Sequence, residues 1–192
     1  MKHNWILDGR PVRAWLCLLL ALLLAGCAAT STLPRQYSGP AQVQSWKLSL
    51  VTASGQTEDS LLVIQPEAQN ATRWIQTNPL GAPLARLSLH DGSWSTDGFL
   101  PPNPRARQLF EAIIAAQMPR AQWPAAYPDT VVTTSTEGGL ATYTFSRQGR
   151  LLWSIRLPAM TTANSGTSQQ PFTHIVLPDH SQWQLTPIST RT

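Results

Sequence analysis

Apolar and polar residues alternate with a period of two along most of the chain from Val43 onward. SWKLSLV at 45–51 and RLLWSIRLP at 150–158 are two clear examples. Further candidate strands lie at 59–65, 71–77, 84–90, 140–147, 172–178 and 181–187. Short strands at regular spacing, separated by tight turns, are typical of antiparallel meanders. The sequence therefore predicts a mainly β fold, built as a barrel or a strongly curved antiparallel sheet.

One segment departs from this alternation. NPRARQLFEAIIAAQM starts with Asn103 in a capping position and Pro104 at the first helical position, and it ends before Pro119. Its apolar residues recur at spacings of three and four, as on one side of an amphipathic helix: Ala106, Leu109, Phe110, Ile113, Ile114 and Met118. The sequence predicts one amphipathic helix, with its apolar side covering the concave face of the sheet.

A curved sheet covered by one helix has an interior that holds either its own side chains or one apolar ligand. Residues on the apolar faces of the strands and of the helix are expected to line it as a hydrophobic cavity: Trp46, Leu48, Leu50, Phe110, Ile113, Ile114, Trp153, Ile155 and Leu157. The pattern is compatible with a tightly packed core and with a ligand cavity.

The N-terminus has the features of a lipoprotein signal. Three basic residues precede the apolar run AWLCLLLALLLAGCAA at 14–29. This run is shorter than the about 20 residues of a membrane-spanning helix and fits the core of a signal peptide. It closes on LAGC, which resembles the lipobox of bacterial lipoproteins. In that family the chain is cut before the cysteine, which then carries lipid chains, so we expect a signal peptide at 1–26 and lipidation of Cys27.

The sequence after Cys27, AATSTLPRQYSGPAQ, is rich in small residues and proline and has no period. Such a composition is typical of a flexible linker, and about 15 residues of it span roughly 20 Å on average. We expect a lipidated cysteine and flexible tether over 27–42, followed by one domain over 43–192. Several acyl chains on the cysteine give stable membrane attachment, whereas one chain gives marginal attachment.

Signatures of other functional classes are weak. Only 12% of the residues are charged and the basic residues are spread singly, without the clustered stripe of a nucleic-acid binder. The histidines at 90, 174 and 180 do not have the HExxH spacing of a metal site. His90-Asp91 and Asp179-His180 are adjacent pairs in predicted turns, and adjacent residues on a strand point to opposite faces. We expect no enzymatic activity, metal, cofactor or nucleic-acid partner.

The motif TNPLG at 77–81 predicts a tight turn between two strands. Asn78 suits the first position of the turn, Pro79 the second and Gly81 the fourth. Leu80, at the tip, has no neighbour in the turn to pack against. It is expected to fold back onto the domain, to meet a partner, or to enter a lipid phase.

The lipobox, the tether, TNPLG, the hairpin YTFSRQGRLLWSIRL and the final hairpin HIVLPDHSQWQL together resemble the outer-membrane lipoprotein receptor LolB and its relatives, over most of residues 43–187. The resemblance implies an incomplete β-barrel with helices over a concave apolar face. It implies a protein that takes the acyl chains of lipoproteins from the soluble carrier LolA and passes the cargo to the outer membrane. It also implies that Leu80 is the protruding turn leucine that promotes membrane insertion.

Residues 84–123 depart from LolB and resemble instead a family of uncharacterised lipoproteins with this fold, some of them encoded beside genes for aryl-polyene lipids. This departure leaves the cargo open between a protein lipid anchor, another lipid, and none. The residue after Cys27 is Ala28 and not an aspartate. By analogy with enteric bacteria, this implies sorting to the outer membrane.

We therefore expect a monomeric lipoprotein on the periplasmic face of the outer membrane that binds acyl chains or lipid. It would accept lipoproteins or lipids from a LolA-like periplasmic carrier, and differential affinity would suffice to move the cargo. The alternative is a non-enzymatic envelope scaffold with a filled barrel, which binds a partner through an edge strand or through the turn at Leu80.

Overall fold

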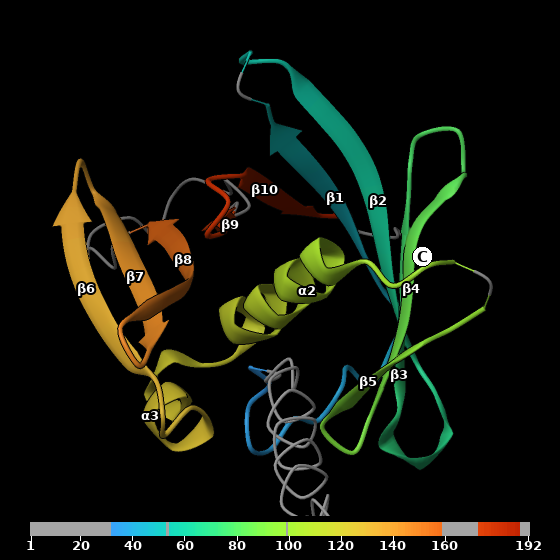
Figure 1. The fold of residues 1–192 in the computed structure, drawn as a ribbon, viewed down its shortest axis with the longest axis horizontal. Helices are drawn as coiled ribbons and strands as arrows, with labels where there is room; N and C mark the ends of the chain where they lie inside the picture. Colours follow the sequence, from blue (N-terminus) through green and yellow to red (C-terminus); the bar gives the residue numbers. More distant parts are fainter. Residues whose placement is uncertain (1–31, 53, 99, 159–172, 189–192) are drawn as a thin grey trace, which may run out of the picture. The chain divides into compact units, whose positions relative to one another are not determined.

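The alternating segments form one curved antiparallel sheet (Figure 1). Its strands are β1 Gln44–Val51, β2 Thr57–Pro66, β3 Thr72–Thr77, β4 Pro83–His90, β5 Ser93–Thr96, β6 Val131–Glu137, β7 Leu140–Arg147, β8 Arg150–Pro158, β9 Thr173–Val176 and β10 Gln182–Pro187. The order across the sheet is β5-β4-β3-β2-β1-β10-β9-β8-β7-β6. In the part of the chain that the structure describes, β5 and β6 are edge strands that do not pair with each other, so the sheet is an incomplete barrel.

The structure is a computed structural model that describes residues 32–52, 54–98, 100–158 and 173–188. The expected signal peptide and Cys27 lie outside these ranges. The described residues belong to one unit that begins at Thr32. The predicted mainly β fold and its curved antiparallel sheet are confirmed.

Two edge strands, β5 and β6, were not predicted. In β6 all seven side chains except the half-buried Val132 are exposed, so no apolar face marks this strand in the sequence. β5 has only four residues and follows directly after the turn at 91–92. Edge strands are often short and polar, which protects the sheet from pairing with other chains, and the same property removes the period-two signal.

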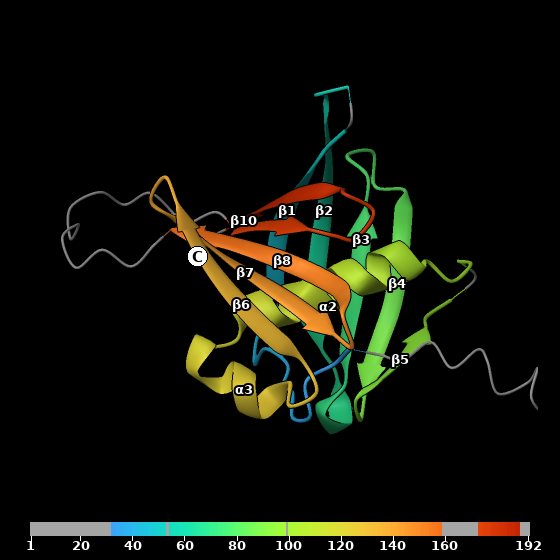
Figure 2. The same ribbon diagram turned by 60° about the vertical axis from the view of Figure 1, so that its left-hand side comes forward.

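The predicted helix is α2, Pro104–Gln117, and it lies in the hollow of the sheet (Figures 1 and 2). Asn103 caps it as expected, because its Oδ1 accepts a hydrogen bond of 3.0 Å from the N–H of Ala106. The apolar side of α2 is fully buried at Leu109, Phe110 and Ile113. The prediction of an amphipathic helix on the concave face is confirmed.

A second, one-turn helix that the sequence did not predict follows α2. It is α3, Trp123–Ala126, and short 3₁₀ turns lie at Arg120–Gln122 (η3) and Ala68–Asn70 (η2). Trp123 is buried, and its Nε1 donates a hydrogen bond of 2.9 Å to the carbonyl oxygen of Ala115 near the end of α2. Proline ends the long helix as predicted, and Trp123 then packs the chain back against that end.

The expected tether differs from the structure over residues 32–42. The N–H of Thr32 donates a 3.1 Å hydrogen bond to Oε2 of Glu111 on α2. The N–H of Arg35 donates one of 2.9 Å to the carbonyl oxygen of Ala126. These two hydrogen bonds join the segment to the domain. Residues 27–31, the rest of the expected tether, lie outside the described ranges.

The turn between β9 and β10 is held to the start of α2 by an ion pair. Nε of Arg105 lies 2.8 Å from Oδ2 of Asp179. Oδ1 of Asp179 accepts hydrogen bonds from the N–H of Ser181 at 3.0 Å and from its Oγ at 2.6 Å. Partial burial acts to raise the pKa of Asp179, but the hydrogen bonds from Ser181 and the charge and hydrogen bond of Arg105 prevail and hold that pKa below its usual value.

The lowered pKa of Asp179 predicts an acid-sensitive contribution to stability. This contribution is complete above the ordinary aspartate pKa of about 3.9 and is lost as the pH falls through the lower value of the folded state. We expect Asp179→Asn to destabilise the protein at neutral pH and to flatten the fall of stability below about pH 4. Urea unfolding as a function of pH measures this effect. The variant Asp129→Asn, at an exposed position, is the control. If the free energy of unfolding falls with pH equally steeply in the two variants, Asp179 makes no such contribution.

Candidate functional site

The residues expected to line a hydrophobic cavity lie in one packed core. Six of them are at most 1% exposed: Leu48, Phe110, Ile113, Ile114, Trp153 and Ile155. The other three, Trp46, Leu50 and Leu157, are partly buried and pack against the same core. Side chains therefore occupy the space between α2 and the sheet in this structure.

Aromatic rings fill much of this core. Phe110 on α2 lies 5.2 Å from the ring of Trp74 and 6.2 Å from that of Trp94. Towards the other edge of the sheet, the rings of Phe145 and Trp153 are 5.6 Å apart. Such pairs add to the stabilisation from burial alone, so they fix α2 in the hollow.

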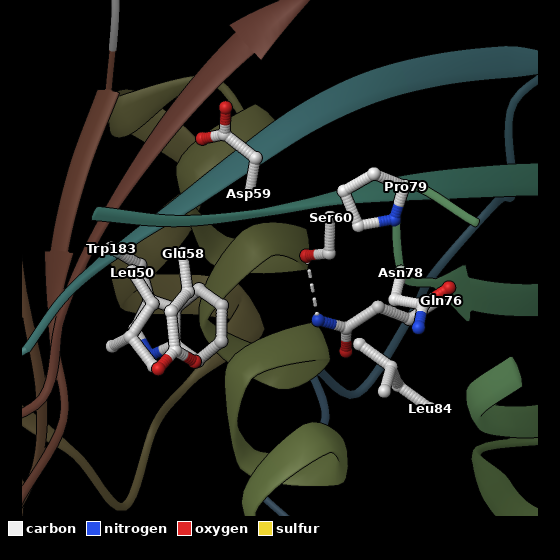
Figure 3. Close-up of a pocket in the computed structure, with 9 residues that line it drawn as sticks. All are labelled: Leu50, Glu58, Asp59, Ser60, Gln76, Asn78, Pro79, Leu84 and Trp183. Carbon is white, nitrogen blue, oxygen red and sulfur yellow. Dashed lines mark hydrogen bonds between the residues drawn. The ribbon is translucent and has the colours of Figure 1, made fainter. Parts of the chain in front are cut away.

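A pocket of about 370 Å³ remains beside this core (Figure 3). Its lining comes from β1, β2, β3, the turn after β3, the start of β4, and β10: Leu50, Glu58, Asp59, Ser60, Gln76, Asn78, Pro79, Leu84 and Trp183. Of the residues predicted to line a cavity, this set contains only Leu50. The structure thus separates the filled core from a smaller opening at one end of the sheet.

Strand register assembles one wall of the pocket. Leu50 on β1 lies opposite Glu58 on β2 and opposite Trp183 on β10. The three residues form a row across neighbouring strands, and Leu84 at the start of β4 lies across the opening in Figure 3. The row combines two apolar side chains with one carboxylate.

The deepest polar groups of the pocket are a buried pair, Gln76 and Ser60. They are 4% and 7% exposed, and Nε2 of Gln76 donates a 3.0 Å hydrogen bond to Oγ of Ser60. Oγ of Ser60 donates in turn to the carbonyl oxygen of Leu48. The amide oxygen of Gln76 points away from Ser60 in Figure 3 and has no hydrogen-bond donor within the described ranges. The oxygen is not among the buried side-chain atoms that lack a partner in the described ranges, so water or the hydrogen-bond donor of a ligand can reach it from the pocket.

The charged groups of the pocket are acidic. Glu58 and Ser60 share one face of β2, whereas Asp59 points to the other face. Asp59 is paired there with Lys47, whose Nζ lies 2.8 Å away, and it accepts a 2.6 Å hydrogen bond from Oγ of Ser49. The hydrogen bond from Lys47, followed by that from Ser49, holds the pKa of Asp59 below its usual value. No lysine or arginine is among the lining residues, so the two charged residues of the lining, Glu58 and Asp59, are both acidic.

The predicted turn at TNPLG forms the rim of the pocket. The N–H of Gly81 donates a 2.9 Å hydrogen bond to the carbonyl oxygen of Asn78. Oδ1 of Asn78 also accepts from the N–H groups of Leu80 at 3.0 Å and Ala82 at 2.8 Å. Leu80 is 93% exposed, so it does not fold back onto the domain in this structure. Two of its three expected fates remain, a partner and a lipid phase.

The docked N-terminal segment lies at the other end of β3 from this turn. Gly39 packs so closely on Thr72, the first residue of β3, that a side chain at position 39 would collide with it. The turn at Leu80 follows Thr77, the last residue, and five residues of strand span about 16 Å. Figures 1 and 2 agree that the segment at 32–42 (blue) and the turn (green) lie at opposite ends.

Glu111 is a buried carboxylate that the sequence analysis missed. It is 5% exposed on α2. Its Oε1 lies 3.2 Å from Nε1 of Trp94 and 3.3 Å from Nε of Arg107, which both donate to it, and its Oε2 binds Thr32. Burial, and then the charge of Glu111, raise the pKa of Tyr127, which stays neutral at physiological pH. Glu111 therefore joins α2, the edge strand β5 and the N-terminal segment.

The histidines that were considered for chemistry lie apart from the pocket. Nδ1 of His90 is 3.4 Å from the exposed carboxylate of Asp91 after β4, and His180 lies in the β9–β10 turn. Among the described residues, no group of three or more His, Cys, Asp or Glu side chains is placed to hold a metal ion. In those same ranges no helix has the length and apolar character needed to cross a membrane.

The fold and the site define a class of protein: an incomplete antiparallel barrel with a helix in its hollow and a pocket at one end, beside an exposed apolar turn. Within this class, the chain belongs to the family described as "Protein of unknown function (DUF3261)", which matches residues 44–186. The match runs from the start of β1 into β10 and includes both the pocket and the turn. A comparison with curated proteins gave no match.

Proposed function

We propose that this chain is a LolB-like lipoprotein, anchored through Cys27 to the periplasmic face of the outer membrane, that binds acyl chains or lipid. It would accept lipoproteins or lipids from a LolA-like periplasmic carrier and pass them to the membrane without a covalent step. The observation that carries the proposal is the pocket at the end of the sheet, next to a turn whose Asn78 and Pro79 line it and whose Leu80 is exposed.

Apolar burial would supply the affinity for an acyl chain. Leu50, Leu84 and Trp183 offer apolar surface, and burial contributes roughly 25 cal/mol per Å² removed from water. The pocket volume of about 370 Å³ is near the lower end of the about 300–1,000 Å³ of small-molecule sites. It would therefore hold one end of an amphiphile, and a longer chain would require α2 to move from the hollow as a lid.

Leu80 would bring the pocket into contact with lipid. A leucine side chain gains about 1.5–3 kcal/mol when it leaves water for an apolar phase. If Cys27 carries the anchor, the anchor would lie within reach of Thr32, because residues 27–31 span at most about 17 Å when extended. The anchor and Leu80 would thus touch lipid at two separate points, and a single bilayer could accommodate both if β3 lies along its surface.

The direct test is to look for bound lipid. A form that lacks residues 1–26 and carries Cys27→Ala would be purified without detergent and examined by native mass spectrometry. We expect co-purifying lipid of one or a few masses. Absence of lipid, together with unchanged tryptophan fluorescence on addition of acylated peptides, would exclude the proposal.

Leu80→Glu tests the insertion step separately. The variant should bind lipid normally but partition into lipid vesicles about tenfold less, because the charged side chain cannot enter the apolar phase. Vesicle flotation of the soluble form measures this partition. Val131→Glu is the matched control, because Val131 is an exposed apolar residue, 62% exposed, on the edge strand β6. If the Leu80→Glu variant and the parent protein float equally with the vesicles, Leu80 does not insert into the membrane.

A filled scaffold is the second candidate, and the packed core favours it. If the interior never opens, α2 is a permanent part of the core and the protein acts through its edge strands or through Leu80. The mass-spectrometric test separates the two candidates, because the scaffold carries no lipid.

A further inference from the structure

We infer that the pocket selects amphiphiles whose polar end is an uncharged hydroxyl or amide group, and that it rejects anionic ends such as a free carboxylate. This inference rests on the proposed lipid binding and names the class of ligand. It depends on three observations: an amide whose oxygen accepts no hydrogen bond from the described residues, an acidic lining, and apolar side chains on both sides of the opening.

The first observation concerns hydrogen bonding at Gln76. One N–H of its amide is used by Ser60, so the second N–H and the amide oxygen remain for a ligand. A hydroxyl or an amide can both donate and accept, and it satisfies both groups. A carboxylate can only accept, so when it covers the amide oxygen it displaces water without donating a hydrogen bond, which costs binding affinity. Gln76 thus favours a polar end that carries at least one hydrogen-bond donor.

The second observation concerns charge. Glu58 lies on the same face of β2 as Ser60, and Asp59 borders the opening. The charge of Asp59 is balanced by Lys47 at 2.8 Å, but Lys47 is not part of the lining. A ligand carboxylate would therefore approach Glu58 with no cation in the pocket to compensate. Like charges in such an opening disfavour binding and also slow the encounter.

The third observation places the apolar part of the ligand. Leu50 and Trp183 lie side by side across β1 and β10, and Leu84 lies across the opening from them. An acyl chain can lie between these apolar side chains while its polar end reaches Gln76, which lines the same pocket. Acyl amides carry an N–H donor directly beside the chain, and monoacyl glycerols carry hydroxyl donors on the glycerol just beyond the ester.

Two probes with the same acyl chain and different polar ends test the selection. Monolaurin carries a glycerol, and laurate carries a carboxylate. Isothermal titration with the soluble Cys27→Ala form, below the aggregation concentration of each probe, gives both affinities. We expect monolaurin to bind at least about tenfold more tightly than laurate, a difference of about 1.4 kcal/mol.

Two variants test whether Glu58 and Gln76 cause the preference for monolaurin over laurate. Glu58→Gln should raise the affinity for laurate several-fold and leave that for monolaurin within a factor of about two. Gln76→Met should weaken monolaurin about tenfold and change laurate less. Glu137→Gln, an exposed carboxylate at the end of β6, is the matched control and should change neither affinity. Glu58 is exposed, so its variant tests the inference even if Gln76→Met fails to fold.

The outcomes distinguish the inference from the function on which it rests. Equal affinities for the two probes, unchanged by Glu58→Gln, would overturn the selection and leave lipid binding intact. Tighter binding of laurate would overturn it as well. No binding of either probe, with no lipid in native mass spectrometry, would overturn both.

Discussion

Phe110→Ala is expected to lower the free energy of unfolding by about 3–5 kcal/mol. Phe110 is 0% exposed, and its ring contacts Trp74 and Trp94 at centroid distances of 5.2 and 6.2 Å. Alanine would leave a cavity between α2 and the sheet that rigid indole rings cannot fill. Urea denaturation followed by tryptophan fluorescence measures the loss.

Leu151→Ala is the control for this substitution. Leu151 is 39% exposed at the start of β8, and its truncation should cost less than about 1 kcal/mol. A loss below about 1 kcal/mol for Phe110→Ala would mean that α2 is not packed in the hollow as described. The same variant should also take up an apolar probe in the space that the ring vacates.

Glu111→Leu is expected to cost about 3 kcal/mol of stability and to release the N-terminal segment. The leucine removes the acceptor for the N–H of Thr32, for Nε1 of Trp94 and for Nε of Arg107. These donors would stay partly buried without the carboxylate, and that cost exceeds the apolar gain of the new side chain. Limited proteolysis should then cut within residues 32–42 at a protease concentration that leaves the parent protein intact.

Glu111→Gln is the matched control, because it keeps one oxygen acceptor at the same place. Its loss of stability should be smaller, about 1–2 kcal/mol. Equal protection of residues 32–42 in the leucine variant and in the parent would show that Glu111 does not hold the segment.

Much of the fold could be predicted from the sequence because burial on one face of a strand leaves a period-two pattern. The strands from β1 to β4 and from β7 to β10 carry this pattern, and α2 carries both an apolar stripe and a cap at Asn103. β6 has no buried face, so the same rule cannot detect it. The docking of Thr32 depends on a long-range contact with Glu111, which has no local signal.

The candidate site was less predictable than the fold. Leu80 could be placed at the tip of a turn because the residues around it have strong turn preferences. Gln76 and Ser60 are 16 positions apart and meet only through the pairing of β2 with β3. Apolar periodicity identifies the residues of a core. The residues predicted from it to line a cavity therefore lie in the packed interior, and of them the pocket contains only Leu50.

Hydrogen–deuterium exchange with and without monolaurin tests the central claim that the pocket binds lipid. Saturating monolaurin should slow the exchange of backbone amides in residues 58–60 and 76–84 and next to Trp183, and Gln76→Met should reduce this protection. The amides of β6, at the other edge of the sheet, are the internal reference. Unchanged exchange in these segments at saturation, or protection confined to β6 to β8, would contradict the account.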